Sequence, residues 1–259
     1  MVSGAFSRLE SEFGARLGVY GLDTGTLKTI SYRATERFAY ASTSKVLLAA
    51  AELAKHGPHA LDGIVRYTHD DLVEYSPVTE KHIGDGMPLR EVIAAALQYN
   101  DNTASNLMFR DLGGPAALGA ALRALGDATT HVDRIEPDLN EASPGDIRDT
   151  TTPEALGTSL DAYALGEGLP KEDQASLAEW MKASTTGATL IRAGVPKGWV
   201  VGDKSGGGQY AARTDIAVIW PPHRPPVVLV IMSSKDNKNA KWDDALIAGA
   251  AKEAIAALE

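Results

Sequence analysis

The spacing of hydrophobic residues changes twice along the chain and divides it into three stretches. Over residues 5–14, apolar side chains recur every three or four positions, which predicts a first helix. Two short apolar runs follow at 16–22 and 29–33, and the turn residues between them, Asp23-Thr24-Gly25, are typical of a β-hairpin. The chain therefore begins with a helix and two paired strands.

The middle of the chain, from about residue 60 to 185, has mostly helical spacing. Proline and glycine mark several helix ends, as at Pro88, which suits a first helical position, and at Gly113-Gly114. An irregular stretch rich in Asp, Pro and Thr covers residues 127–152, and a loop of this length in a compact domain is usually functional or disordered. Helices are predicted from Ser42 to about Gly57 and over 88–99, 101–112, 115–125, 153–165 and 171–182.

Strand-like runs return after about residue 198. The stretches at 199–204, 212–220 and 227–232, which are rich in Val, Ile and Trp, predict three successive antiparallel strands, and a helix over 240–258 ends the chain. We therefore expect an α+β fold: an antiparallel five-stranded sheet built from both ends of the chain, flanked by N- and C-terminal helices, with an inserted all-helical lobe and an active site in the cleft between them. The expected single domain is 1–259, with an α/β lobe at 1–35 and 185–259 and a helical lobe at 36–184.

The 259 residues carry a formal net charge of -9, and they include no cysteine. We expect neither nucleic acid nor membrane as a partner, because the chain is acidic and no apolar run approaches the length of a membrane span. The lack of cysteine excludes disulfides, thiolate nucleophiles and cysteine-ligated zinc. The six histidines show no metal-ligand spacing such as His-x-x-x-His, so we place them on the surface or in packing and predict no metal.

Ser42 and Lys45 stand at the start of the helix that follows the hairpin. Ser42 has N-cap chemistry, and a lysine three residues on lies on the same helix face. The amine can accept the hydroxyl proton, and the helix N–H groups and dipole favour an oxyanion nearby, so this pair suits acyl transfer. The alternative is an ordinary capped helix with a solvent-facing lysine.

Two stretches in the middle of the chain could act with this hydroxyl–amine pair. Asn100-Asp101-Asn102 opens a helix, which an ordinary N-cap also explains. Glu136 and Asn140 lie four residues apart in the long loop, and a carboxylate and an amide at this spacing could hold the water that hydrolyses an acyl-enzyme. Glu136 could equally be one of many solvated acids.

Further candidates lie in the C-terminal strands and at the ends of the long loop. Lys204-Ser205-Gly206-Gly207-Gly208 combines a lysine, a hydroxyl and bare backbone, which suits an edge strand that receives a carboxylate-bearing amide; a flexible Gly-rich hairpin is the alternative. The stretch lacks the strand–turn–helix context of a phosphate loop, so we reject nucleotide binding. Arg213 is an anion partner for the same ligand, and Arg134 with the Arg148-Asp149 pair could close the loop through a salt bridge.

Together these stretches resemble the class A serine β-lactamases, within the wider family of penicillin-recognising serine enzymes. Ser-x-x-Lys is present as Ser42 to Lys45, Lys-Thr/Ser-Gly as Lys204-Ser205-Gly206, and Ser-Asp-Asn only in part. The Glu-x-x-x-Asn loop is specific to class A. The resemblance extends from about Phe6 to the terminal helix and includes framework-like segments at 76–82, 149–153 and 186–187.

The resemblance implies a hydrolase of penicillins and cephalosporins that needs no metal or other cofactor. Ser42 would attack the lactam carbonyl, with its own backbone N–H and that of Gly207 as the oxyanion hole. Lys45 and Glu136, the latter through a water, are the alternative bases for acylation. Glu136, with Asn140 holding the water, would drive deacylation.

The resemblance assigns the remaining residues to substrate binding or to support. The substrate-binding set is Tyr75 at the cleft mouth, Asn102 at the substrate's amide side chain, and Lys204, Ser205 and Arg213 at its carboxylate. The supporting set around the long loop, which is the omega loop of the family, is Asn106, Arg134 and Asp149. We also expect β-lactam substrates and inhibitors as partners, a monomer, and a secreted or periplasmic location, although residues 1–6 lack the pattern of a signal peptide.

One position departs from the family pattern, because Asn100 stands where the Ser-Asp-Asn motif has its serine. That hydroxyl relays a proton to the leaving lactam nitrogen, and an amide cannot relay a proton in the same way. We therefore predict altered acylation, with water or Ser205 as a substitute relay. Two alternatives stay open: a β-lactam-binding protein or slow-turnover sink, which Asn100 favours, and a DD-peptidase-like or esterase-like acyl transferase, which the Glu136–Asn140 pair disfavours.

Overall fold

The structure is a computed structural model that describes residues 2–259, so Met1, the first residue of the expected domain, lies outside the described residues. The helices are α1 (Val2–Phe13), α2 (Ser44–His56), α3 (Leu89–Gln98), α4 (Asn102–Leu112), α5 (Pro115–Leu125), α6 (Pro153–Ala164), α7 (Lys171–Lys182), α8 (Ile191–Gly194) and α9 (Asp244–Leu258). The strands are β1 (Arg16–Asp23), β2 (Thr29–Tyr32), β3 (Phe38–Ala39), β4 (Ile64–Val65), β5 (Met87–Pro88), β6 (Thr150–Thr151), β7 (Val200–Gly207), β8 (Arg213–Trp220) and β9 (Val227–Ser234). Two short 3₁₀ turns, η1 (Ala41–Thr43) and η5 (Asp138–Asn140), lie near the site described below.

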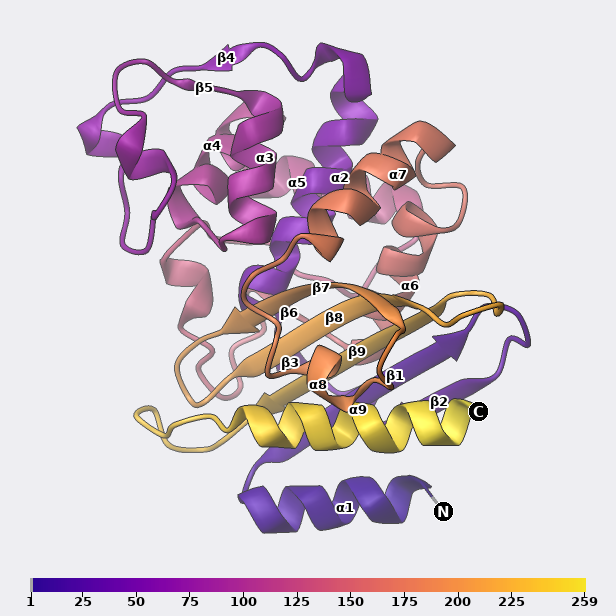
Figure 1. Ribbon diagram of the computed structural model, residues 1–259. Coiled ribbons are helices and arrows are strands. Elements are labelled where there is room, and N and C mark those ends of the chain that lie inside the picture. The colour runs from indigo at the N-terminus through magenta and orange to yellow at the C-terminus, as the bar shows by residue number, and fades with distance from the viewer. Residues whose placement is uncertain (1) are drawn as a thin grey trace.

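The long strands form one antiparallel sheet in the order β2-β1-β9-β8-β7 (Figure 1). Strands from the two ends of the chain meet at its centre, where Arg16 of β1 pairs with Ser234 of β9. At the edge, Gly207 of β7 pairs with Arg213 of β8. The predicted five-stranded sheet is therefore confirmed.

The central strand β9 is buried on both faces. Leu229 and Ile231 belong to the apolar cluster that includes residues of α1 and α9, whereas Val228 and Val230 belong to the cluster of α2 and α6. Successive residues of a strand point to opposite faces, so a strand covered on both sides is a continuous apolar run. Figure 1 shows α1 and α9 on one side of the sheet and most of the helices on the other. The division of the chain into two lobes stays a prediction.

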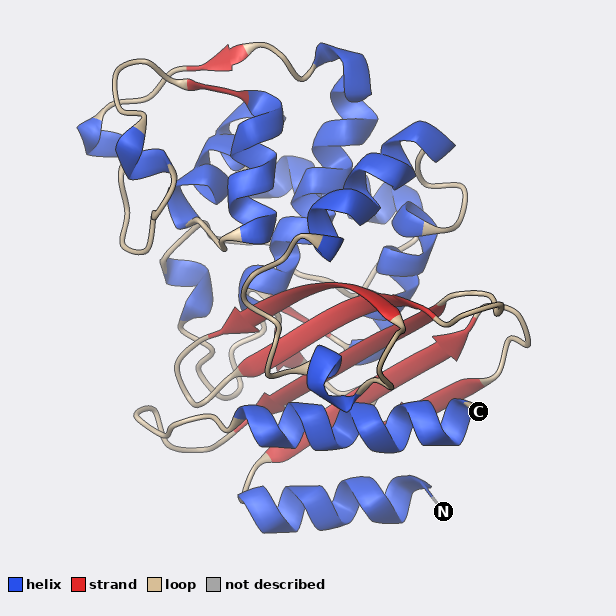
Figure 2. Cartoon of the chain, viewed as in Figure 1, coloured by secondary structure: helices blue, strands red, loops and turns tan. Residues whose placement is uncertain are grey.

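The helix α2 runs through the middle of the helical layer, where it is enclosed. Residues Ser44 to Leu53 are all buried, and the Lys45 side chain is fully enclosed. The alternative interpretation, an ordinary capped helix with a solvent-facing lysine, is therefore wrong. The predicted N-cap is also wrong, because Ser42 lies in η1 and Thr43 occupies the N-cap position without a side-chain cap hydrogen bond. Figure 2 shows this helical layer (blue) over the sheet (red).

Besides α4, which starts at Asn102 rather than at Asp101, two other helices begin later than predicted. Pro88 ends β5 and precedes α3, which starts at Leu89. The last helix starts at Asp244 rather than at residue 240, because the Asp243 side chain accepts a hydrogen bond at 2.9 Å from a backbone N–H of the first turn and caps the helix there. Both differences concern boundaries, which local capping decides.

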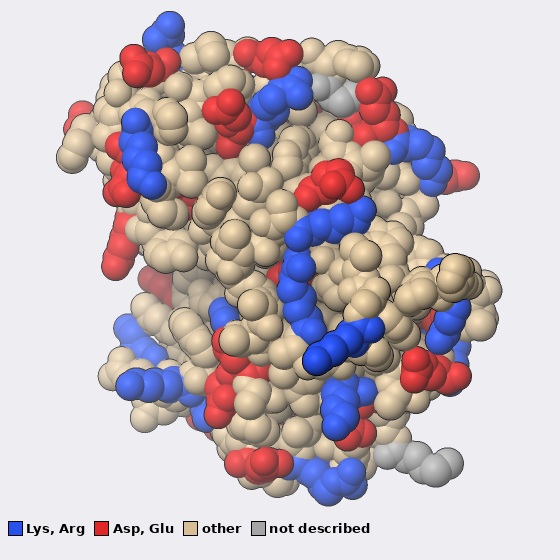
Figure 3. Space-filling model, in the orientation of Figure 1, with Lys and Arg blue, Asp and Glu red and all other residues tan. Residues whose placement is uncertain are grey.

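The surface mixes charges of both signs on the face drawn in Figure 3, with Lys and Arg beside Asp and Glu. No helix in residues 2–259 is long and apolar enough to cross a membrane. Near the middle of that face several Lys and Arg side chains adjoin one another, with Asp and Glu around them.

Candidate active site

Ser42 lies in η1, immediately before α2, and the end of β7 packs against this turn. A Cβ at Gly206 would lie 3.0 Å from the Ser42 backbone nitrogen and 2.5 Å from Thr214 Oγ1, so this close approach requires glycine. The neighbouring Ala41 has a φ of 48°, a left-handed conformation that is strained for a residue with a Cβ. Backbone strain of this kind is concentrated at functional sites.

The Lys45 side chain joins three groups. Its Nζ donates hydrogen bonds to Ser42 Oγ at 2.8 Å and to Asn102 Oδ1 at 2.9 Å, and a third to Glu136 Oε1. These bonds use all three donors of an ammonium group. The Ser42 hydroxyl also donates to Glu136 Oε1 at 3.3 Å. A serine, an amine and a carboxylate therefore meet in a fully buried cluster, where electrostatic interactions are stronger than in water.

Glu136 is held at both its backbone and its carboxylate. Asn106 Nδ2 donates to Glu136 O, and Glu136 N donates to Asn106 Oδ1, each at 2.9 Å. Asn140 Nδ2 donates to Glu136 Oε2. The buried Oδ1 of Asn140 has no hydrogen-bond partner among the residues that the structure describes, so it can accept a hydrogen bond from a water beside the carboxylate.

The long loop is closed at its base by Arg134 and Asp149. Arg134 Nε donates to Asp149 Oδ2 at 2.5 Å, and Asp149 Oδ1 accepts a hydrogen bond from the Tyr40 hydroxyl at 3.0 Å. Because Tyr40 directly precedes η1, this carboxylate links the loop to the turn that carries the serine. Arg148 pairs with Asp146 instead, so the bridge expected across the loop forms through Arg134 and not through Arg148.

Lys204 reaches from β7 to the start of α4. Its Nζ donates to Asn100 Oδ1 at 2.8 Å and to Ser205 O at 2.6 Å, which leaves one N–H for another acceptor. Burial, and then the positive charge of Lys45, lower the pKa of Lys204 to about 7. Asn100 has a φ of 60°, which asparagine tolerates better than most residues. Since its oxygen accepts from Lys204, its NH₂ group is the part left for a ligand.

Arg213 on β8 is positioned by residues outside the sequence motifs. Asp244 accepts hydrogen bonds from Arg213 Nε at 2.7 Å and Nη2 at 3.1 Å, and the guanidinium lies over the Trp242 ring, 5.1 Å from its centre. The Thr186 and Ser205 hydroxyls share a hydrogen bond of 2.7 Å. The acidic pair Asp243-Asp244 at the start of α9 is a recognisable capping signal, whereas Trp242 lies in an irregular loop where no periodic pattern marks it.

These groups surround one cleft of about 930 Å³. Tyr75, with 56% of its surface exposed, and Gly207 contribute to its walls. The predicted site residues that line it are Ser42, Tyr75, Asn100, Asn102, Asn140, Ser205, Gly207 and Arg213. The hydrogen bonds above connect Lys45, Glu136 and Lys204 to these lining residues, and Asn106, Arg134 and Asp149 support the loop.

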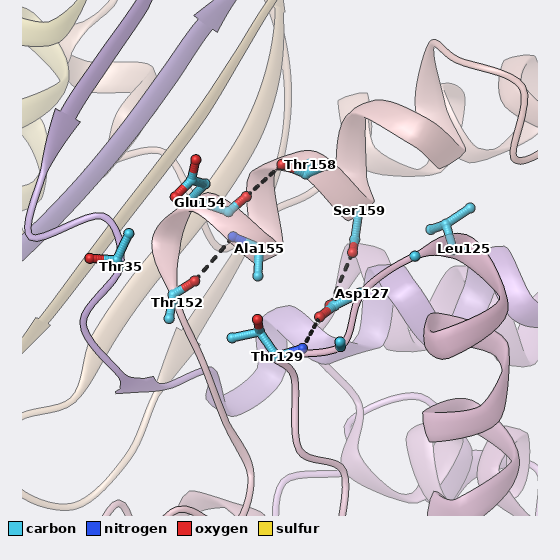
Figure 4. A pocket seen from close by; sticks show the side chains of 11 residues that line it. Thr35, Leu125, Asp127, Thr129, Thr152, Glu154, Ala155, Thr158 and Ser159 are labelled. Carbon is cyan, nitrogen blue, oxygen red and sulfur yellow. Dashed lines mark hydrogen bonds between the residues drawn. The ribbon is translucent and has the colours of Figure 1, made fainter.

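A separate hollow of about 410 Å³ lies between α6 and the segment after α5 (Figure 4). Its polar groups bond to one another: Ser159 Oγ donates to Asp127 Oδ2 at 3.1 Å, and Thr152 Oγ1 accepts from the N–H of Ala155 at 3.1 Å. The first bond ties the segment to α6 and the second caps that helix. The polar residues of this hollow are used in hydrogen bonds that hold the fold together, so the cleft at Ser42 is the candidate active site.

Comparison with known proteins identifies the family of this fold and site. A sequence model of the β-lactamase enzyme family matches residues 2–258. The β-lactamase of Amycolatopsis lactamdurans is 52% identical over 253 residues, which cover 98% of this chain and 84% of the relative. A β-lactamase of Bacillus amyloliquefaciens is 54% identical over 250 residues, with 96% and 82% covered.

Solved structures agree with these sequence relatives. The crystal structure of a class A β-lactamase from Clostridium kluyveri has a TM-score of 0.98 at 46% identity, with 99% of this chain and 98% of that chain covered. A halotolerant bacterial β-lactamase gives a TM-score of 0.96 at 48% identity, with 98% of both chains covered. The chain belongs to the β-lactamase enzyme family, and its resemblance to class A is confirmed. It is therefore an enzyme, and β-lactam hydrolysis is the activity of its family.

Proposed function

We propose that the protein hydrolyses penicillins and cephalosporins through an acyl-enzyme on Ser42, which a water activated by Glu136 releases. The observation that carries this proposal is the 2.8 Å hydrogen bond between Lys45 Nζ and Ser42 Oγ, with Glu136 Oε1 in contact with both side chains. A nucleophile within hydrogen-bond reach of a base, itself oriented by a third group, is typical of covalent catalysis.

Acylation begins when Ser42 Oγ attacks the lactam carbonyl carbon and gives its proton to a base. Glu136, which already accepts a hydrogen bond from the hydroxyl, is one candidate, directly or through a water. Lys45 is the other, after it passes a proton to Glu136 through their hydrogen bond. The backbone N–H groups of Ser42 and Gly207 stabilise the oxyanion that forms.

Deacylation uses the other side of the Glu136 carboxylate. A water between Glu136 and Asn140 loses a proton to the carboxylate and attacks the acyl carbon, and Ser42 leaves as the alcohol. The unpartnered Asn140 Oδ1 supports this role because it can accept one hydrogen bond from the water and so direct a lone pair at the ester. The two hydrogen bonds from Asn106 keep the Glu136 backbone in place during this step.

Two cationic side chains, Lys204 and Arg213, face the substrate carboxylate and differ in how far their charge is already balanced. Lys204 has an unused N–H, whereas the charge of Arg213 is balanced by Asp244, so Lys204 supplies most of the net attraction for the substrate carboxylate. The Ser205 hydroxyl adds a hydrogen bond beside it. Asn102 donates one N–H to Glu74 O at 3.0 Å and keeps the other for the substrate's amide side chain.

Asn100 favours the second candidate function, a β-lactam sink that turns over slowly. Its amide can hold Lys204 but cannot pass a proton to the leaving nitrogen. The proton then comes from a water, from Ser205, or from Lys204, whose pKa of about 7 suits proton donation near neutral pH. A DD-peptidase-like or esterase-like acyl transferase is a third possibility, which the Glu136–Asn140 pair disfavours.

A stopped-flow reaction with a chromogenic cephalosporin, with intact-protein mass taken in parallel, separates these functions. Many turnovers per enzyme without a lasting adduct support a working β-lactamase. A single burst with a stable adduct on Ser42 supports the sink. Neither a burst nor an adduct, together with cleavage of a D-alanyl-D-alanine peptide or a simple ester, would support the acyl transferase.

We further propose that the enzyme is an exported monomer and that the helical lobe, residues 36–184, and the α/β lobe border the cleft. The family's β-lactam substrates support an extracytoplasmic location. Sedimentation analysis and fractionation of the native host test these two points.

A further inference from the structure

The end of α2 farthest from Ser42 meets the end of α4 in a cluster of ionisable side chains. His56 Nε2 lies 2.6 Å from Asp111 Oδ2 and 3.4 Å from Glu52 Oε2. One ligand-type atom from each of the three residues lies within 4.8 Å of those of the other two. An imidazole nitrogen therefore lies between two carboxylates from two helices.

The Glu52 carboxyl group distinguishes this cluster from an ordinary surface ion pair. Its side chain is completely buried, and neither oxygen has a hydrogen-bond partner in the part of the chain that the structure describes. Buried polar groups are nearly always hydrogen-bonded, so such a group calls for an explanation. The basic side chain beside it is the His56 ring, whose Nε2 lies 3.4 Å from Oε2, and the Asp111 carboxylate adjoins both groups.

The surroundings favour a cation at this point. His56 is the last residue of α2, and Asp111 lies in the last turn of α4, so the negative ends of two helix dipoles converge on the cluster. The Lys55 ammonium already binds here, where it donates to Asp111 Oδ2 at 2.9 Å and also to the Asp111 carbonyl oxygen. The Lys55 side chain is 40% exposed and can move away into solvent.

We propose that Glu52, His56 and Asp111 bind one divalent transition-metal ion, and that Zn²⁺ fits their chemistry best. Imidazole and carboxylate are ordinary zinc ligands, and three protein ligands leave a fourth position for water. This proposal departs from the sequence prediction of no metal. It is also independent of the proposed catalytic steps, because Ser44 and His56 are about 18 Å apart along α2.

The distances are compatible with such an ion after a small adjustment. At metal–ligand distances near 2.0–2.2 Å, the ligand atoms of a tetrahedral site lie about 3.3–3.5 Å apart. The 3.4 Å separation of Glu52 and His56 meets this condition directly. The 2.6 Å separation of His56 and Asp111 must widen by about 0.8 Å, which a rotation of the partly exposed Asp111 side chain provides. A pocket of about 450 Å³ lined by both residues gives the ion a path from solvent.

The test is a titration of the metal-free full-length protein with Zn²⁺ by calorimetry and with Co²⁺ by visible absorption. We expect saturable 1:1 binding in the wild type, and binding at least tenfold weaker in Glu52→Gln and in His56→Asn. Removal of the competing cation in Lys55→Gln should tighten binding. His69→Asn, at an exposed histidine outside the cluster, is the matched control and should bind as the wild type does.

Two results would overturn the proposal. One is no saturable binding of either ion by the wild type, and the other is binding that both Glu52→Gln and His56→Asn leave unchanged. Turnover of a chromogenic cephalosporin at the wild-type rate shows that each variant is folded. If neither ligand variant folds, the comparison of wild type with Lys55→Gln decides: tighter binding supports the site, and equal affinity refutes it.

Discussion

The Asp149 carboxylate offers the sharpest test of how the long loop is held. It accepts hydrogen bonds from the Tyr40 hydroxyl and from the backbone N–H groups of Asp133 and Arg134, each at 3.0 Å, and from Arg134 Nε at 2.5 Å. Asp149→Asn keeps one oxygen for the first three bonds but turns an NH₂ group toward the guanidinium. Its φ of 54° suits asparagine as well as aspartate, so the backbone adds no cost.

The expected loss follows from the burial of this ion pair. The Asp149 side chain is 1% exposed and that of Arg134 is 16% exposed, so solvent compensates little. Breaking a buried pair costs about 3–5 kcal/mol, and Arg134 keeps its contact with Glu141, so we expect about 3 kcal/mol. For a chain of this size that corresponds to a fall in Tm of about 6–12 °C.

The kinetic consequence should fall mainly on deacylation, because Glu136 lies between the two ends that this bridge joins. A displacement of 1 Å in a catalytic group can cost about 100-fold in rate, so the acyl-enzyme of Asp149→Asn should persist up to about 100 times longer than that of the wild type. Differential scanning calorimetry and single-turnover stopped flow measure the two effects.

Asp146→Asn is the matched control in the same loop. The ion pair of Asp146 with Arg148 is exposed, and exposed pairs contribute little, so its Tm and deacylation rate should equal those of the wild type. The reasoning fails if Asp149→Asn shows no change in either quantity, or if the control loses as much.

Three further substitutions test the side of the cleft formed by Asn100 and Lys204, and the buried Asp215 in the sheet. Asn100→Ser should speed acylation of Ser42 by restoring a hydroxyl relay, while its left-handed backbone costs about 1 kcal/mol of stability; an unchanged burst rate would contradict the relay argument. The substrate carboxylate is attracted by Lys204 only while the amine is protonated, so kcat/KM for anionic substrates should fall as pH rises through about 7. Lys204→Arg should abolish that fall, because arginine stays charged. Burial, and then the Asp203 carboxylate, raise the pKa of the Asp215 carboxyl group in the folded protein. The free energy of unfolding should therefore decline as pH rises above about 4, the usual carboxyl pKa, because the unfolded chain loses this proton first. Asp215→Asn removes that loss, so its gain in Tm over the wild type should grow with pH.

The sheet was predictable because its sequence signals are local and strong. The runs over 216–220 in β8 and 227–232 in β9 are apolar, and the two N-terminal strands flank a clear turn. Helix starts were less predictable, because several neighbouring residues have a similar propensity for the N-cap position, and the sequence does not show which of them, such as Asp243, occupies it. The short pairing of β3 with β6 has no periodic pattern at all, since each strand has two residues.

The candidate site was partly predictable because its motifs are contiguous. Ser42 and Lys45 are three residues apart, so a shared face could be predicted from their spacing, although Ser42 lies in η1 and not in the helix itself. Trp242 and Asp244 approach Arg213 only through the fold, and no sequence rule brings these segments together. The bridge predicted between Arg134 and the Arg148-Asp149 pair forms at Asp149, because Arg148 reaches Asp146, two residues away, without ordering the loop.

The most direct test of the central claim is intact-protein mass of Glu136→Gln after brief incubation with a penicillin. The account predicts an adduct of the full substrate mass on Ser42 that persists, because the amide side chain cannot deprotonate the deacylating water. Wild-type protein under the same conditions should return to its free mass as substrate is consumed. Turnover by Glu136→Gln at the wild-type rate, or hydrolysis by Ser42→Ala, would contradict the account.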